Sequence, residues 1–235
     1  VQTYRNVFKR WNDSLKQCLR QIRETKQKLS IGKLSGVSGN NIQNPFPREV
    51  NALRELGLYP VVSSQIIPRE RFLDYFYCIL RIIVAVEKIA FDIRMYSVDG
   101  INEMAEPFRE GQKGSSAMPH KKNPILTENI CGLTRLYKSY FSVAVENCTT
   151  LFERDISHSS TERIIFKDAG HIACFTLKRL HTVIQDIQLF PETALKNCST
   201  ANDQVSSQKK MMDDIKLGKS RKESHDIQQK LSFDT

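Results

Sequence analysis

The feature that most constrains this chain is an apolar pattern between residues 67 and 97. Apolar side chains recur there at alternating spacings of four and three residues, at Phe72, Phe76, Ile79, Ile83, Val86, Ala90 and Ile93. A spacing that averages 3.5 residues is typical of helices packed nearly parallel to one another. A second apolar row (Tyr75, Ile82, Ile89, Tyr96) widens this face. As one helix the segment would be about 46 Å long, and we expect it to need partners on several sides.

The same spacing returns in three other segments. Their apolar positions are Tyr4, Phe8, Trp11, Leu15, Cys18 and Ile22, then Ile130, Leu133, Tyr137, Tyr140 and Ala144, and then Ala173, Leu177, Leu180, Ile184 and Ile187. No strand-like alternation of useful length appears. The sequence therefore predicts an all-α fold, a bundle of long helices. One chain supplies some of the partners that such helices need, and we expect other subunits to supply the rest.

Two stretches depart from this pattern. Residues 31–68 are rich in glycine, asparagine and proline and indicate a loop, with a short helix at about 47–57 that ends at Gly57. Beyond Cys198 the apolar positions become sparse and lysines stand where a buried helix would carry leucine. We therefore divide the chain into a central helical bundle domain, 1–199, and the start of a C-terminal helical region, 200–235.

The composition restricts the classes of molecule that we expect this chain to bind. The formal net charge of +9 suits either nucleic-acid phosphates or a small polyanionic substrate, but lysine and arginine are spread along the chain, and we expect no nucleic-acid partner. The six cysteines show no metal-ligand spacing, so we expect no metal site and a reducing compartment. No apolar run approaches the length of a membrane span. A cytoplasmic protein without a membrane partner is the prediction.

One loop carries most of the chemistry-bearing residues. Residues 111–129 read GQKGSSAMPHKKNPILTEN and combine glycines, adjacent hydroxyls, a histidine and two lysines. Asparagine is a strong N-cap and proline is favoured at the first helical position. We therefore expect Asn123 to cap the third long helix, whose positive end would lie beneath the loop and attract a carboxylate or phosphate. The alternative is a polar linker in which Ser115 and Ser116 make turn hydrogen bonds.

A second polar cluster follows the third helix. Residues 152–163 read FERDISHSSTER, in which arginines bracket a run of hydroxyls. Arginine suits phosphate or carboxylate because its planar fork can donate two parallel hydrogen bonds. Arg154, Ser159 and Arg163 could converge on one anion. A charged turn between two helices explains the same residues equally well.

These motifs together resemble a known family. The stretch GSSAMPHKKNP resembles the signature loop of the fumarase/aspartase superfamily, and with its flanks QKG and ILTEN it is similar to that of the adenylosuccinate lyases. ERDISHSSTERI is similar to the nucleotide-binding segment of those lyases. Gln65 and the following Arg69-Glu70-Arg71 resemble the stretch that opens their long central helix. The resemblance runs from about residue 4 to 200 and weakens afterwards.

The resemblance implies a reaction and roles for particular residues. It implies a β-elimination that releases fumarate from adenylosuccinate and from succinylated aminoimidazole carboxamide ribotide in purine biosynthesis, without a cofactor, in a homotetramer with shared active sites. Ser115 would be the catalytic base, and Glu128 would orient an acid histidine. Lys121, also catalytic, and Asn123 would bind the succinyl carboxylates and stabilise the dianionic intermediate. The other implied substrate contacts are Gln65 at the succinyl portion, Ser116, Met118 and Asn129 along the site, and Arg154, Ser159 and Arg163 at the nucleotide.

The chain also departs from this family. Members are nearly twice as long, and the SSxxxDT-like and RTHGQ-like stretches of their histidine-bearing regions are absent here. We therefore expect a fragment of a longer protein or a truncated product, with little lyase activity of its own. Two alternatives stay open. One is another fumarate-releasing lyase of the superfamily, and the other is a non-catalytic helical scaffold that assembles with a full-length partner.

Overall fold

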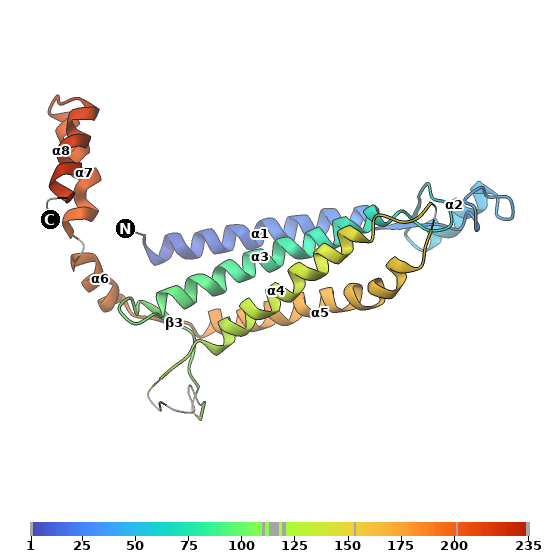
Figure 1. Ribbon diagram of the computed structural model, residues 1–235, viewed down its shortest axis with the longest axis horizontal. Helices are drawn as coiled ribbons and strands as arrows, with labels where there is room; N and C mark the ends of the chain where they lie inside the picture. Colours follow the sequence, from blue (N-terminus) through green and yellow to red (C-terminus); the bar gives the residue numbers. More distant parts are fainter. Residues whose placement is uncertain are drawn as a thin grey trace.

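The fold is an elongated bundle built around one central helix (Figure 1). The computed structural model describes residues 2–109, 111–112, 118, 121–152, 154–200 and 202–233, without the side chains of 202–205. Helix α3 (Leu73–Tyr96) packs against α1 (Tyr4–Lys28), α4 (Ile125–Glu146) and α5 (Ser157–Gln185). Three of the partners that the apolar pattern requires are thus present within one chain, and the predicted all-α class is confirmed.

The predicted apolar faces form the core of this bundle. Phe76, Ile79, Ile83, Val86, Ala90 and Ile93 of the α3 pattern are all buried. One cluster joins α1 and α3 to the first turns of α4 and the end of α5, around Trp11, Ile89 and Ile130. The other joins α3, α4 and α5 further along the bundle, around Phe76, Tyr137 and Ile165. The spacing pattern therefore identifies most of the core, although Ile22 on α1 is exposed.

Polar contacts between the helices fix the register in which they pack. The Trp11 indole Nε1 donates to Asp92 Oδ2 at 3.0 Å, which sets α1 antiparallel to α3. The Tyr137 hydroxyl donates to the Phe76 carbonyl at 2.7 Å and ties α4 to α3. Burial raises the pKa of Tyr137 well above its usual value, so this hydroxyl stays a donor. Lining up such specific partners favours one register among the many that apolar packing allows.

One end of the bundle carries the loop-rich segment 31–68. Strands β1 (Ile31–Gly32) and β2 (Tyr59–Pro60) pair in parallel, and α2 (Phe46–Glu55) lies between them in sequence. The buried carboxylate of Glu49 accepts hydrogen bonds from the Leu34 amide and the Asn41 side chain, both at 2.6 Å. The predicted short helix is present and ends just before Gly57, which has a φ of +69°.

The long helix predicted for 67–97 begins differently. A 3-10 turn, η1 (Arg69–Phe72), precedes α3, so the regular α-helix starts only at Leu73. Pro68 lacks an amide hydrogen and disfavours helical geometry at Ile67, which accounts for the late start.

The opposite end of the bundle leads into the C-terminal region. Strands β3 (Met104–Ala105) and β4 (Gln188–Leu189) pair antiparallel there, and α6 (Pro191–Thr200) follows. Helices α7 (Asn202–Lys216) and α8 (Arg221–Phe233) then form a hairpin that projects away from the bundle (Figure 1). Within the described ranges no helix combines the length and apolarity needed to cross a membrane.

Candidate active site

The loop between β3 and α4 holds the first set of candidate residues. Residues 113–117, 119 and 120 lie outside those that the structure describes, and they include the predicted base Ser115, Ser116 and His120. The described flank is anchored by a hydrogen bond from the Lys121 amide to the Met118 carbonyl at 3.1 Å. The Lys121 side chain is exposed, and the Lys122 ammonium lies 5.5 Å from the centre of the Phe108 ring.

The start of α4 differs from the prediction. The cap residue is Pro124, so the expectation that Asn123 caps the helix with proline at the first helical position is wrong by one residue. The amides of Leu126 and Thr127 donate to the two carboxylate oxygens of Glu106, both at 3.0 Å. The Thr127 hydroxyl donates to the same carboxylate at 3.0 Å. Glu106 is only 5% exposed.

The contact with Glu106 limits how the N-terminus of α4 can bind an anion. A helix N-terminus attracts an anion because its first amides have no partner within the helix. Here Glu106, a buried carboxylate from the chain itself, already accepts from two of these amides. These two amides are therefore already engaged and do not wait for an anionic substrate. Sequence reasoning missed Glu106, because only its position in the fold brings it to α4.

Two further candidates lie on the first turns of α4. Glu128 belongs to the first helical turn, and both Glu128 and Asn129 are exposed. They share this end of the bundle with Met118, Lys121 and Asn123. The structure thus gathers the described candidates of the signature-loop segment at one end, which we call the signature-loop end.

The second set of candidates lies at the other end of the bundle, where α4 passes into α5. Arg154 precedes α5, and Ser159 and Arg163 are four residues apart in its first turns, so that they share one helical face. Both arginines are exposed, and Ser159 is half-buried. Gln65 lies in the segment that leads into η1 and is exposed as well. We call this region the α4–α5 corner.

Asp155 organises the start of α5. Its carboxylate accepts hydrogen bonds from the amides of Leu151 and Ser157, each at 2.8 Å, and from the Ser157 hydroxyl. These contacts, the Ser157 hydroxyl first, lower the pKa of Asp155 to about 2. The corner therefore presents arginine side chains beside a helix end that already has its own carboxylate.

An ion pair joins the corner to the beginning of α3. Arg69 Nη1 lies 3.0 Å from Glu162 Oε2, and the two side chains are only 13% and 16% exposed. The Arg69 guanidinium also lies 4.7 Å from the centre of the Phe72 ring. Within the Arg69-Glu70-Arg71 motif, Arg69 therefore holds η1 against α5, whereas Arg71 is exposed.

One buried histidine at the corner has an unusual environment. His158 is 4% exposed, and its Nδ1 has no hydrogen-bond partner among the described residues. The nearby Asn147 accepts from the Thr161 hydroxyl at 3.0 Å. The burial of His158 makes it a packing residue at the corner and separates it from the exposed arginines.

The candidates that the structure describes fall into two sets that lie apart within one chain. Helix α4 runs from the signature-loop end to the corner, and its 22 residues span about 33 Å. Figure 1 shows the starts of α4 and α5 at opposite ends of the bundle. One copy of the chain therefore presents two separated halves of the predicted site.

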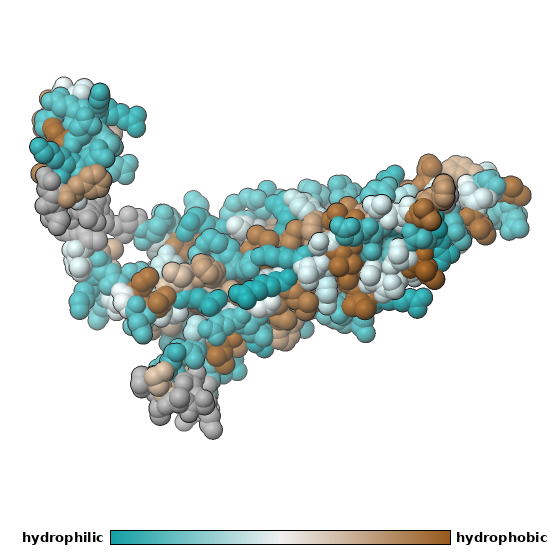
Figure 2. Space-filling model, viewed as in Figure 1, coloured by the Kyte–Doolittle hydropathy of each residue, from teal (hydrophilic) through white to brown (hydrophobic). Residues whose placement is uncertain are grey.

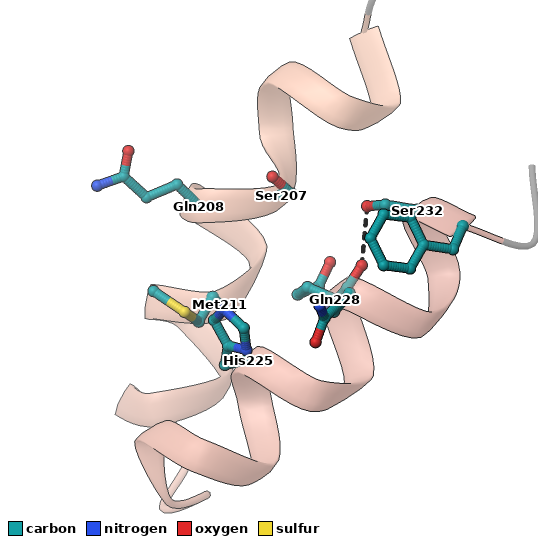
Figure 3. A pocket seen from close by; sticks show the side chains of 8 residues that line it. Ser207, Gln208, Met211, His225, Gln228 and Ser232 are labelled. Carbon is teal, nitrogen blue, oxygen red and sulfur yellow. Dashed lines mark hydrogen bonds between the residues drawn. The ribbon is translucent and has the colours of Figure 1, made fainter.

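The hairpin of α7 and α8 forms a groove of its own. Figure 3 shows Met211 of α7 facing His225 and Gln228 of α8, with Ser232 donating to the Gln228 carbonyl at 2.8 Å. None of the candidate residues predicted from the sequence lines this groove. It therefore does not contribute to the candidate site.

Comparison with known proteins identifies relatives of this chain. A family model described as lyase matches residues 3–135. The adenylosuccinate lyase of Thermotoga maritima is 37% identical over 226 residues, which cover 96% of this chain and 52% of that enzyme. The adenylosuccinate lyase of Helicobacter pylori is 38% identical over 228 residues, covering 97% and 52%. The chain thus spans about half the length of the curated relatives that it matches.

Solved structures show the same fold. The β-carboxy-cis,cis-muconate cycloisomerase of Acinetobacter calcoaceticus superposes with a TM-score of 0.77 at 18% identity, over 94% of this chain and 48% of that one. A fumarate lyase from Mesorhizobium superposes with a TM-score of 0.76 at 19% identity, over 93% and 48%. At these identities the likeness concerns the arrangement of the helices.

Proposed function

The chain belongs to the lyase family, and we propose that it carries part of the active site of an adenylosuccinate lyase. The observation that carries this proposal is the 37% identity to an adenylosuccinate lyase over 96% of the chain. The proposed reaction is the β-elimination of fumarate from adenylosuccinate, which yields AMP, and from succinylated aminoimidazole carboxamide ribotide. We place it in purine biosynthesis in the cytoplasm.

In this proposal the signature-loop end handles the succinyl group. Ser115 removes the proton beside the carboxylate, and Lys121 and Asn123 bind the succinyl carboxylates. The negative charge that develops during elimination needs positive charge and donors already in place. Because Glu106 occupies the first amides of α4, the exposed Lys121 ammonium is the main source of that charge. Ser116, Met118 and Asn129 complete this half of the site, with Glu128 orienting an acid histidine.

The corner supplies the other half. Arg154, Ser159 and Arg163 bind the nucleotide portion, and Gln65 contacts the succinyl portion. Since the two ends of one bundle are about 30 Å apart along α4, the site joins the signature-loop end of one copy to the corner of another. A homotetramer with shared sites provides this arrangement.

The surface of α3 supports assembly. Tyr77, Val84, Phe91 and Met95 recur at helical spacing and are between 47% and 50% exposed, although each is largely apolar. Exposed apolar side chains on the most apolar helix of a bundle favour contact with further helices. Figure 2 shows apolar residues interspersed with polar ones along the visible face of the bundle.

The test is an activity assay with hybrid assemblies. The purified chain alone should show little or no loss of adenylosuccinate. Mixed with a full-length Thermotoga maritima lyase that is inactivated only at its equivalent of Ser115, it should restore turnover, because it brings the missing serine. The matched control is the chain with Ser115→Ala, which should restore nothing. Turnover by the chain alone at the rate of a complete lyase, or no restoration in verified hybrids, would contradict the proposal.

A panel of substrates separates the alternatives. The same hybrids are offered argininosuccinate and malate beside adenylosuccinate, with fumarate formation or consumption as the readout. Preference for adenylosuccinate supports the nucleotide role of the corner. Preference for another substrate assigns the chain to a different fumarate-releasing lyase, and hybrids that assemble without any activity support a non-catalytic scaffold.

A further inference from the structure

A hollow lies at the base of the signature loop, on the side of α5. Its volume is about 390 Å³, and it is lined by residues from the segment after β3, from the first turns of α4 and from the second half of α5. The residues that matter for its chemistry are Pro107, Arg109, Leu126, Phe175, Lys178 and Arg179. We call it the loop-base pocket. None of the residues that we propose to contact the substrate lines it.

Positive side chains reach this pocket from two sides. Arg109 comes from the segment after β3, and Lys178 and Arg179 come from α5. None of the three forms an ion pair with a residue that the structure describes. The nearby carboxylate of Glu106 is buried and accepts from the amides of α4. Unpaired cations that line one hollow raise the local concentration of anions.

The wall of the pocket is apolar. Pro107 is buried, Leu126 is half-buried, and Phe175 is 45% exposed. The Arg179 guanidinium lies 4.6 Å from the centre of the Phe175 ring, a cation–π contact that brings its charge beside this wall. Small-molecule sites commonly combine such an apolar wall with a few polar groups that orient the ligand. A bare inorganic ion would leave this wall unused.

We propose that the loop-base pocket binds a small organic anion that carries two negative charges and an apolar or aromatic body. The charges contact Arg109, Lys178 and Arg179, and the body packs on Phe175 and Leu126. Such a ligand would join the segment that enters the signature loop to α5. Its occupancy would therefore restrain the base of the loop without filling the proposed substrate site.

The volume supports a ligand of this kind. About 390 Å³ lies in the range of sites for small organic molecules and exceeds what a single phosphate needs. Arginine and lysine accept both phosphate and paired carboxylates. The proposed ligand is thus a doubly charged oxyanion on an apolar body. The probes must distinguish an organic phosphate from a dicarboxylate.

The test is calorimetric titration of the chain at low ionic strength with phenyl phosphate, isophthalate and inorganic phosphate. We expect at least one of the organic dianions to bind at least about tenfold more tightly than inorganic phosphate, because the ring packs on the apolar wall. Tighter binding of phenyl phosphate assigns the pocket to organic phosphates, and tighter binding of isophthalate assigns it to dicarboxylates. Equal or stronger binding of inorganic phosphate would overturn the proposal.

Matched variants locate the binding. Lys178→Gln and Arg109→Gln should each weaken the organic dianion about tenfold, because each removes a charge-assisted contact. Lys167→Gln changes an exposed lysine of the same helix outside the pocket and should leave affinity unchanged. Equal losses in all three variants, or none, would show that the anion binds elsewhere. The titration needs no turnover, so its outcome is independent of the proposed lyase activity.

Discussion

The starts of α4 and α5 lie at opposite ends of the bundle, and the amides at each start find a hydrogen-bond acceptor in a different way. Each helix end receives a carboxylate from the chain itself. At α4 it comes from Glu106, which lies 20 residues from Leu126 in sequence and is 5% exposed. At α5 it comes from Asp155, two residues before Ser157 and partly exposed to solvent. One cap is a tertiary contact and the other is local.

The difference bears on how each end binds substrate. Glu106 precedes the signature loop, and Leu126 and Thr127 lie at its other flank. Their buried hydrogen bonds therefore hold both flanks of the loop against the bundle. Asp155 instead organises a short turn between two helices and leaves Arg154 and Arg163 exposed beside it. At each end, the amides that donate to these carboxylates are thus already engaged within the chain. The comparison predicts that disrupting the first cap affects the whole bundle and disrupting the second affects the corner only.

The largest expected effect is at Glu106. Glu106→Ala should lower the free energy of unfolding by about 3 kcal/mol, because two amides and the Thr127 hydroxyl lose their buried acceptor. Urea denaturation measures this change. Glu128→Gln, at an exposed position of the same helix turn, is the control and should change stability little. A loss at Glu106 no greater than that of the control would contradict the role assigned to the buried cap.

The ion pair at the corner should have a smaller effect. Glu162→Gln leaves Arg69 without its acidic partner in a mostly buried position, and we expect a loss of about 2 kcal/mol. The double variant with Arg69→Met should recover part of this loss, because no unpaired charge then remains. If the two single losses simply add in the double variant, the residues do not interact as the structure indicates.

The smallest effect is expected at Asp155, and it should depend on pH. Hydrogen bonds lower its pKa from 3.8 to about 2 in the folded chain. The stabilisation is therefore present above pH 3.8 and is lost as the pH falls towards about 2. Asp155→Asn should be less stable than the unchanged chain at neutral pH, and the difference should shrink through that window. A difference that stays constant with pH would contradict this account of the cap.

Much of the fold could be predicted from residue spacing alone. The alternation of four and three residues identifies the buried face of α3, because helix geometry places those positions on one side. The start of α4 could not be predicted in the same way. Asn123-Pro124 has the local signature of a cap, but the actual acceptor is Glu106, which only tertiary packing brings there.

The candidate site, too, could be predicted from the sequence only where its residues are close in sequence. Motif spacing groups Lys121, Asn123 and Glu128 correctly at one end of a helix, because they are close in sequence. It groups Arg154, Ser159 and Arg163 for the same reason. The sequence also places the predicted third helix between the two groups, but only the structure shows how the other helices pack around it. The loop-base pocket was also unpredictable, since Arg109 and Lys178 come from distant segments.

The central claim is that one copy of the chain holds two separated halves of a site. Spin labels on non-natural amino acids at positions 121 and 163, diluted with unlabelled chain, allow the distance within one copy to be measured by pulsed electron resonance. The account predicts about 30 Å or more, since most of α4 lies between these positions. A distance less than half of that would mean that one copy brings the two ends together, and it would contradict the claim.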